Sequence, residues 1–386
     1  MRKTLLIPFL LFILLPSWNR IANAQSQVIS DVEPASGSVV CPPGVYNEVP
    51  SDCLPLGPSE FLAQSAEQGL PYPVLPLPAY SPDKGLNDLP YQYFKITEAG
   101  SVLFPSLAAV LSNQPSRVLP SSKDIYVSLK GETVTTRGST YYKLRLGSWV
   151  LGEGRNLDKF NPPFQGLLFS STPRNAFGWI LNEIQSRSSP GLNSPESGIT
   201  HFRFQVVQIY SIQKADNLIW YLINPGEWVE ARLVARVDPL PVPPAGVTGS
   251  RWISVNLFQQ TIAAYENNRL VFASLVSTGV NQVWTRPGLF RIQKKLETQT
   301  MSTSDPGNFY YLADVPWIMY FDGTRALHGA YWHNNFGYMR SAGCVTLSPG
   351  DAHWLYDWAS EGDFVYVYDP SGQTPTDPEL FEPAAP

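Results

Sequence analysis

The chain has 386 residues, of which 44% are hydrophobic and 15% are charged, and its net charge is −5. A chain of this length predicts two or three domains, and its hydrophobic fraction is enough for a sizeable core. Because neither the net charge nor any basic segment offers a positive surface, we expect no nucleic-acid partner. The 36 prolines favour β-structure, loops and extended linkers over long helices.

Residues 1–24 have the features of an export signal. Arg2 and Lys3 precede an apolar run that ends at Leu15, and residues 22–24 form a small-residue cleavage motif. The run is shorter than the roughly 20 apolar residues that span a bilayer. We therefore expect an extracytoplasmic protein, secreted or associated with the cell wall, with no stable membrane insertion after signal cleavage. An uncleaved N-terminal anchor is the alternative.

Residues 25–90 form a proline-rich N-terminal segment that contains two cysteines. Cys41 and Cys53 flank a short loop of prolines, glycine and polar residues, and in an oxidising compartment we expect them to form a disulfide. Such a bridge contributes about 3 kcal/mol by the chain-entropy model. Cys344 then remains as a free thiol in an exported protein, which favours a chemical role; intermolecular pairing is the alternative.

Residues 91–162 and 163–238 each consist of short runs of β-forming residues. Both contain the pattern Tyr, four residues, Gly, one residue, Trp-Val, at 142–150 and at 221–229. This shared pattern indicates an internal repeat. Each copy resembles the strand pair of a small bacterial SH3-like barrel, so we expect two small SH3-like β-barrels here.

The tryptophans of this repeat, Trp149 and Trp228, have two interpretations. Packing in the core of each barrel is the favoured one, because large aromatic side chains dominate small cores. The alternative is that they are platforms that stack on the sugars of a wall polymer.

A second proline-rich linker, 239–250, precedes the last domain, 251–369. Residues 252–257 alternate between apolar and polar, as a half-buried strand does. Residues 348–351 predict a short helix, because a serine cap is followed by proline and an acidic residue. The dipole of that helix would favour a nearby thiolate. The fold class is mainly β, with a disordered tail expected at 370–386.

The stretch 326–347 carries the candidate chemistry. A cysteine nucleophile needs a base and hydrogen-bond donors for the oxyanion. Gly343 allows the backbone to turn before Cys344, so that amide N–H groups could face an oxyanion. His328 could lie alongside across two strands, with its tautomer fixed by a backbone carbonyl. A buried inert cysteine and a core histidine explain the same residues, so both interpretations remain open.

A metal site is a further alternative, since His328, His333 and Cys344 are residue types that bind zinc. The chain has no Cys-x-x-Cys and no His-Glu-x-x-His motif. We therefore expect no metal and no cofactor.

The segments HGAYW (328–332) and SAGCVTLSPGDAHWLYDWA (341–359) resemble the signature of the L,D-transpeptidase catalytic domain, YkuD type. Upstream, STG (277–279) and TRPGLF (285–290) resemble the opening strands of that domain, with Arg286 inserted. The resemblance covers 251–369 and implies a β-sandwich-like catalytic domain with one short helix.

The resemblance also implies roles. Cys344 is the nucleophile and His328 the general base, oriented by the carbonyl of Gly329, and the N–H groups of Gly343 and Cys344 form the oxyanion hole. Two positions differ from the family pattern: Ala342 replaces a histidine, and Thr346 replaces Asn or Arg. These changes bear on efficiency and substrate preference more than on the reaction class.

We expect substrate-binding residues in the signature and in the polar stretch 296–316. They are Ser341, Trp332, Thr346, Tyr310 and Tyr311. The polar stretch is expected to be a lid or substrate-facing loop; an ordinary long hairpin is the alternative.

The resemblance implies an exported peptidoglycan L,D-transpeptidase that forms 3→3 crosslinks between stem peptides through a cysteine thioester. Carbapenem-type β-lactams are then expected inhibitors. Three alternatives remain: an L,D-carboxypeptidase, a transferase with a wall-protein amine as acceptor, and a non-catalytic wall-binding protein with a decayed site.

Overall fold

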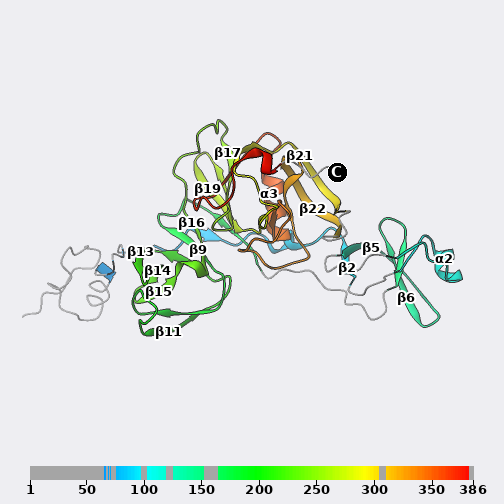
Figure 1. The fold of residues 1–386 in the computed structure, drawn as a ribbon, viewed down its shortest axis with the longest axis horizontal. Coiled ribbons are helices and arrows are strands. Elements are labelled where there is room, and N and C mark those ends of the chain that lie inside the picture. Colours follow the sequence, from blue (N-terminus) through cyan, green and yellow to red (C-terminus); the bar gives the residue numbers. More distant parts are fainter. Residues whose placement is uncertain are drawn as a thin grey trace, which may run out of the picture.

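The structure is a computed structural model of the chain. It describes residues 65–66, 68, 70, 75–96, 102–118, 125–151, 164–303 and 310–381. The expected signal segment and the expected Cys41–Cys53 bridge lie outside the described residues. Figure 1 shows a central β-rich body that contains α3, with a green module on one side of it and a cyan module on the other.

Two large sheets form the central body, and the second of them continues into the cyan module (Figure 1). The first has the order β1 (Ala79–Tyr80), β8 (Leu167–Phe169), β19 (Arg269–Leu275), β18 (Thr261–Glu266), β17 (Arg251–Asn256), β25 (Phe364–Tyr368) and β20 (Gly288–Arg291). The second has the order β24 (Val345–Leu347), β23 (Arg325–Gly329), β22 (Tyr311–Asp322), β5 (Ile125–Thr136), β6 (Ser139–Leu144), β7 (Trp149–Leu151), β3 (Val102–Phe104) and β4 (Arg117–Val118). Off this path, β2 (Gln92–Lys95) pairs with β5 and β21 (Lys294–Ser302) pairs with β22.

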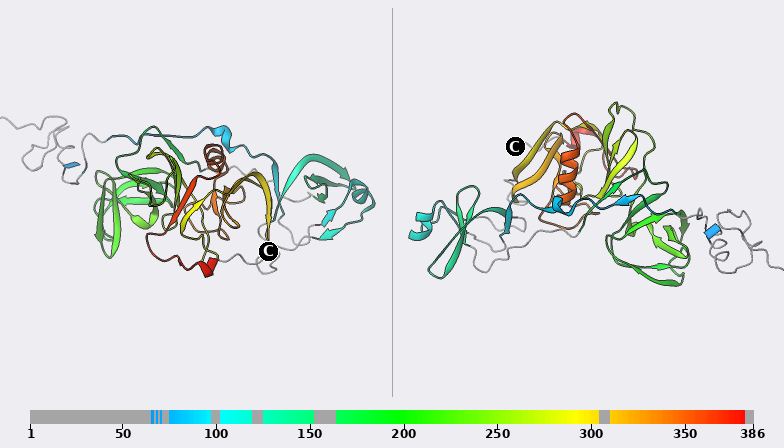
Figure 2. Two further views of the ribbon diagram at one scale, coloured as in Figure 1. Left: turned by 90° about the horizontal axis from the view of Figure 1, so that it is seen from above. Right: turned by 180° about the vertical axis from the view of Figure 1, so that it is seen from behind.

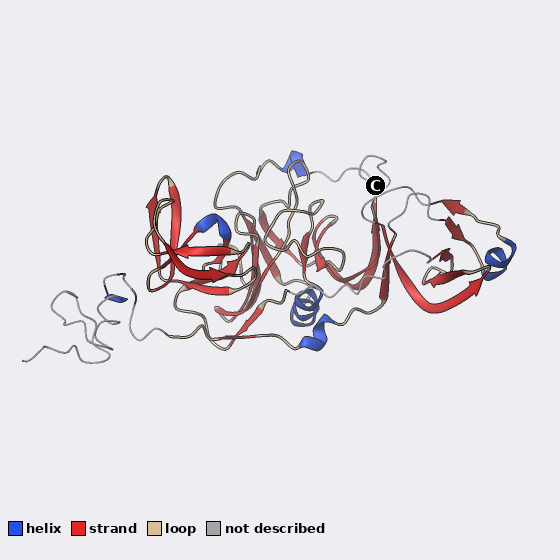
Figure 3. Cartoon of the chain, turned by 90° about the horizontal axis from the view of Figure 1, so that it is seen from below, coloured by secondary structure: helices blue, strands red, loops and turns tan. Residues whose placement is uncertain are grey.

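Two smaller sheets form the green module. One has the order β11 (Glu196–His201), β10 (Ile184–Arg187), β15 (Glu227–Glu230), β14 (Leu218–Asn224) and β13 (Ser211–Ala215). The other has the order β12 (Val206–Ile209), β9 (Ala176–Ile180) and β16 (Val234–Val237). The helices are α2 (Leu107–Ser112) and α3 (Pro349–Trp358), with 3₁₀ turns η2 (Lys84–Asn87), η3 (Ala231–Leu233) and η4 (Pro378–Phe381). Strands dominate the described chain, which confirms the mainly β class (Figure 3).

The core of the central body lies between the two large sheets. Ile253 and Phe272 of the first sheet share one buried cluster with Leu327 and Val345 of the second, and Leu355 of α3 joins it. Figure 2 shows α3 within this body, between strands of both sheets. The predicted helix start is confirmed, since Ser348 caps α3 and accepts a hydrogen bond from the Asp351 N–H.

The central strands β17 and β18 of the first sheet are buried on both faces. Trp252 of β17 packs into a second cluster with Phe164 and Trp179, whereas its neighbour Ile253 faces the first cluster. The expectation of a half-buried strand at 252–257 is therefore wrong: chain from the upstream block covers the face that alternation assigned to solvent.

The repeated sequence pattern forms the same local structure twice. In both copies the tyrosine pairs with the valine of an antiparallel hairpin, Tyr142 with Val150 and Tyr221 with Val229. Trp149 and Trp228 are buried in separate clusters, as the core-packing interpretation predicts. The two SH3-like barrels as whole units remain a prediction.

The sheets join residues across the expected domain boundaries. β8, from the range expected for the second barrel, pairs with β19 of the last domain. β5, from the range expected for the first barrel, pairs in parallel with β22. Local sequence patterns carry no signal for these long-range pairings.

Residues 370–381 of the C-terminal tail are folded back on the central body, unlike the disorder expected there, and 382–386 lie outside the described residues. Asp369 accepts hydrogen bonds from Ser371 and Thr374. Phe381 is buried, its carbonyl accepts a hydrogen bond of 3.1 Å from Arg325, and its ring faces that guanidinium. Within the part of the chain that the structure describes, no helix combines the length and apolarity needed to cross a membrane.

Candidate active site

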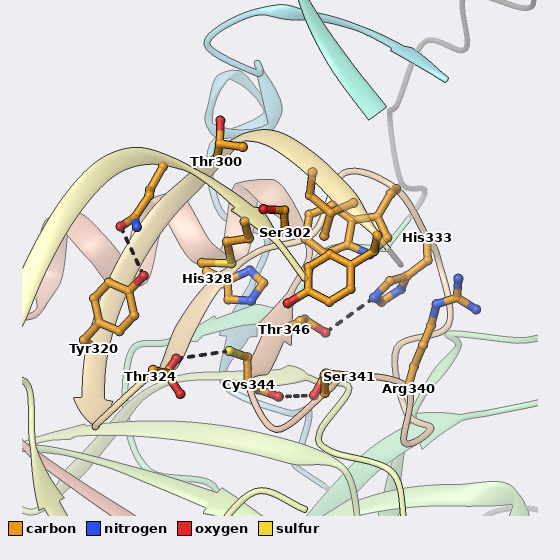
Figure 4. Close-up of a pocket in the computed structure, with 16 residues that line it drawn as sticks. Thr300, Ser302, Tyr320, Thr324, His328, His333, Arg340, Ser341, Cys344 and Thr346 are labelled. Atoms are coloured by element: carbon orange, nitrogen blue, oxygen red, sulfur yellow. Dashed lines mark hydrogen bonds between the residues drawn. The ribbon is translucent and has the colours of Figure 1, made fainter. Parts of the chain in front are cut away.

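A pocket of about 630 Å³ opens between the β21–β22 hairpin and the segment around Cys344. The hairpin supplies one wall, with Met301, Tyr310 and Tyr320 among its lining residues. His328 and Cys344 lie at its base (Figure 4). The pocket therefore contains both residues expected to carry the chemistry.

The pairing of β23 with β24 brings His328 and Cys344 together. The two strands are parallel, with Leu327 opposite Val345 and His328 opposite Thr346. Cys344 immediately precedes β24, so its side chain enters the pocket next to that of His328 (Figure 4). The expectation that these two residues meet across two strands is confirmed.

His328 is held as a neutral base. Its Nδ1–H donates to the carbonyl of Gly329 at 3.1 Å, as the resemblance implies, and this leaves Nε2 as the ring atom that can accept a proton. Only 2% of His328 is exposed, and this burial lowers its pKa to about 4. The Trp332 ring stacks on the imidazole at an interplanar angle of 30°, with 5.8 Å between centroids. His328 is thus unprotonated at neutral pH.

Cys344 rests as a thiol. Its Sγ lies 3.9 Å from the carbonyl oxygen of Thr324, to which the S–H donates. Burial raises the pKa of the thiol, while a backbone hydrogen bond from Ala326 and the charge of Arg325 oppose that rise. Attack therefore requires the S–H to turn from Thr324 toward His328.

The expected helix dipole acts elsewhere. β24 separates Cys344 from the start of α3, and the first turn of that helix faces a different group of residues. Asp351 accepts hydrogen bonds from the Gly166 N–H, at 2.9 Å, and from the Ser274 hydroxyl, at 2.7 Å. Acidic Asp351 and these contacts occupy the helix start.

The turn before Cys344 differs in part from the expected oxyanion hole. Gly343 has φ of 112°, the left-handed region where glycine is favoured. Its N–H donates to the Ser341 hydroxyl at 3.2 Å, and that hydroxyl donates to the Cys344 carbonyl. Among the hydrogen bonds of the described residues, none uses the Cys344 N–H, which leaves it able to face an oxyanion. Ser341 holds this turn in addition to lining the pocket.

His333 and Thr346 form a second polar pair in the pocket. The Asn335 N–H donates to His333 Nδ1 at 3.2 Å, which places the ring proton on Nε2, 3.4 Å from Thr346 Oγ1. Thr346 in turn donates to the Ser277 carbonyl at 3.0 Å. His333 is therefore a donor and not a base, and burial with the nearby charge of Arg340 lowers its pKa to about 3. No three His, Cys, Asp or Glu side chains in the described ranges are grouped to hold a metal.

The structure separates the two tyrosines expected at the substrate. Tyr310 lines the pocket, as do Trp332, Thr346 and Ser341. Tyr311 does not: it pairs with Ile125 and packs on the core of the upstream sheet. The polar stretch 296–316 forms the hairpin of β21 and β22, with 304–309 outside the described residues, and this hairpin also lines the pocket.

Sequence reasoning missed several lining residues. Met301 lies on β21, a strand that the polar composition of the stretch 296–316 concealed, and Tyr320 lies on β22 just beyond that stretch. Arg340 stands four residues before Cys344, and it is the one Lys, Arg, Asp or Glu side chain among the described lining residues. Its position inside the signature stretch was the available signal.

Comparisons with known proteins find one family model that is similar to the C-terminal part of the chain. Residues 250–367 match the family model of the L,D-transpeptidase catalytic domain, YkuD. No curated protein matches the chain. The match covers less than a third of the chain and includes His328, Gly343 and Cys344.

Three solved structures are similar to part of this chain. A mutant L,D-transpeptidase of Enterococcus faecium is 22% identical, with TM-score 0.29, covering 31% of this chain and 50% of that chain. The catalytic domain of the E. faecium enzyme acylated by ertapenem is 25% identical, with TM-score 0.29, covering 32% and 100%. The L,D-transpeptidase of Mycobacterium smegmatis is 19% identical, with TM-score 0.30, covering 53% and 90%. This chain spans about half the length of the E. faecium mutant.

Because the Cys344 pKa is raised and the His328 pKa is lowered, the resting pair is thiol and imidazole, not thiolate and imidazolium. Alkylation of Cys344 by iodoacetamide should be slow at pH 7 and should rise as the pH passes above the ordinary thiol range. Mass spectrometry of the Cys344 peptide follows the rate. A rate that is already maximal between pH 5 and 7, and that falls in His328→Ala, would show a preformed ion pair and contradict this account.

Proposed function

We propose that the chain is an exported L,D-transpeptidase that crosslinks peptidoglycan stem peptides. The observation that carries the proposal is the pairing of β23 with β24, which sets a neutral histidine with a free Nε2 beside a cysteine in the pocket of a YkuD domain. The export features of residues 1–24 agree with a substrate outside the cytoplasm.

The first half-reaction forms a thioester. His328 Nε2 takes the thiol proton as Cys344 Sγ attacks the carbonyl of the third residue in a donor tetrapeptide. The Cys344 N–H faces the developing oxyanion. When the tetrahedral intermediate collapses, the imidazolium protonates the leaving amine and the terminal D-Ala departs.

The second half-reaction forms the crosslink. A side-chain amine of a neighbouring stem loses its proton to His328 and attacks the thioester carbonyl. The C–S bond breaks, the thiol is regenerated, and a 3→3 peptide bond remains. The broken peptide bond supplies the acyl group, so the reaction needs no nucleotide.

The acceptor distinguishes the alternatives. Water in place of the amine gives an L,D-carboxypeptidase, and a wall-protein amine gives an anchoring transferase. A non-catalytic wall-binding protein is the third alternative. The intact constellation of His328, the Gly329 carbonyl and Cys344 favours an enzyme over a decayed site.

The experiment is incubation of the purified protein with a disaccharide-tetrapeptide, followed by mass spectrometry of the products, with Cys344→Ala as control. Transpeptidation predicts a dimer that has lost one D-Ala. Tripeptide without dimer would identify the carboxypeptidase instead. Identical product profiles for the parent protein and Cys344→Ala would contradict both enzymatic functions.

Arg340 is proposed to bind a substrate carboxylate. It is a cation in an otherwise uncharged described lining, close in sequence to the nucleophile, and guanidinium groups pair with carboxylates through charge-assisted hydrogen bonds. Stem peptides carry free carboxylates, so the pocket and the donor are complementary in charge.

Replacing Arg340 by Gln should raise KM for a tetrapeptide donor about tenfold or more, because a hydrogen bond to a charged group is worth about 1.5–3 kcal/mol. Arg340→Lys keeps the charge, so its KM should lie between those of the parent protein and Arg340→Gln. A donor with amidated carboxylates should show no difference among the three proteins. An equal KM increase for both donors would mean that Arg340 acts on pocket shape and not on the carboxylate.

A further inference from the structure

The part of the chain that carries β2, β5, β6 and β7 is called the upstream module below. It contributes side chains to the packing around the active site. Tyr93 of β2 and Tyr126 of β5 are 3% and 2% exposed. They belong to a buried cluster with Tyr331, against which Trp332 and Cys344 pack. Residues more than 200 positions before the nucleophile thus lie in its immediate surroundings.

Tyr126 holds the segment that follows β23. Its hydroxyl donates to the carbonyl of Trp332 at 3.1 Å. Its ring meets Tyr331 edge-on, with 5.9 Å between centroids and an interplanar angle of 75°. Both contacts act on residues 331–332, which follow the Gly329 carbonyl that orients His328.

Tyr93 holds the same segment from the other side. Its ring stacks on Tyr331 with centroids 3.7 Å apart. Its hydroxyl donates to the Asp314 carbonyl at 2.7 Å, and the Tyr331 hydroxyl donates to the Ala313 carbonyl at 2.6 Å. The segment after β23 is therefore tied to β22 through side chains of the upstream module.

Asp314 is a second link between the module and the hairpin wall. Its carboxylate accepts hydrogen bonds from Ser128 and from Arg145, the latter at 3.1 Å. Its backbone has φ of 45°, which is uncommon for a residue other than glycine. A conformation of this kind persists where the surrounding contacts fix it, and here two of these contacts come from the upstream module.

Trp332 transmits these contacts to the catalytic pair. Its ring lines the pocket and stacks on the His328 imidazole at an interplanar angle of 30°. If the Trp332 backbone moves, the aromatic cover over His328 moves with it, and water reaches the base and the thiol.

We infer that Tyr126 and Tyr93 are positioning residues of the Cys344–His328 site. The upstream module then completes the active site. The inference rests on the proposed function only for its catalytic consequence, since the effect on the Trp332 segment and on Cys344 access holds for any role of the pocket.

The test compares Tyr126→Phe with Tyr141→Phe in the full chain. Both substitutions remove one hydroxyl and keep the buried ring, but Tyr141 packs on Phe104, away from the pocket. The measurements are amide hydrogen exchange of residues 330–336 and iodoacetamide alkylation of Cys344, with the urea midpoint as a check on global stability.

Tyr126→Phe should raise exchange in 330–336 and Cys344 alkylation about fivefold to tenfold, the effect of losing one hydrogen bond of about 1 kcal/mol or slightly more. Tyr141→Phe should stay within about twofold of the parent. Tyr93→Phe, which removes the hydroxyl that donates to the Asp314 carbonyl, should also raise exchange in the same segment. If the Tyr126 and Tyr141 variants match in both measurements, the inference is overturned.

Acylation by a carbapenem separates this inference from the proposed function. If the parent is acylated, Tyr126→Phe should slow acylation about tenfold and shift the acidic limb of its pH profile upward, because hydration raises the His328 pKa from about 4. An acidic limb that stays in place would contradict the catalytic consequence. If the parent is not acylated while exchange and alkylation respond as expected, the proposed function fails and the positioning role stands.

Discussion

The pairing of β23 with β24 is the constraint on which the rest of the site depends. β24 has only three residues, yet it is held on both edges: β23 pairs along one, and on the other the Ser277 and Thr346 backbones exchange two hydrogen bonds of 2.9 Å. This double anchoring fixes the backbone at Cys344, and Gly343 and Ser341 set the turn before it. The same register fixes the direction of the His328 side chain, because a shift of one residue would turn it to the opposite face.

The central body depends in turn on chain from outside the catalytic domain. Asp351 is buried at the start of α3, where burial raises its pKa to about 6, and it binds Gly166 of the upstream block together with Ser274 of β19. Phe164 and Trp179 cover the outer face of the first sheet. On the other side, Tyr93 and Tyr126 pack behind the pocket. The part of the chain that matches the family model therefore lies between two upstream segments that each bury part of its surface.

The sequence predicted the site well where the signal is local. The motif around Cys344, the serine cap of α3 and the hairpins of the repeat all concern residues within a few positions of one another. It predicted poorly where distant segments meet: the pairing of β5 with β22 takes Tyr311 away from the pocket, and the packing of Phe381 on Arg325 orders the described tail. The hydrogen bond from the Gly343 N–H to Ser341 depends on a turn geometry that residue types alone do not specify.

The measurement that tests the central claim most directly is the intact mass of the purified protein after exposure to a carbapenem. If Cys344 is an acylating nucleophile with His328 as its base, the protein mass should increase by one molecule of the drug. This increase should be absent in Cys344→Ala and strongly slowed in His328→Ala. No mass gain in the parent protein, or an equal gain in Cys344→Ala, would contradict this role of Cys344.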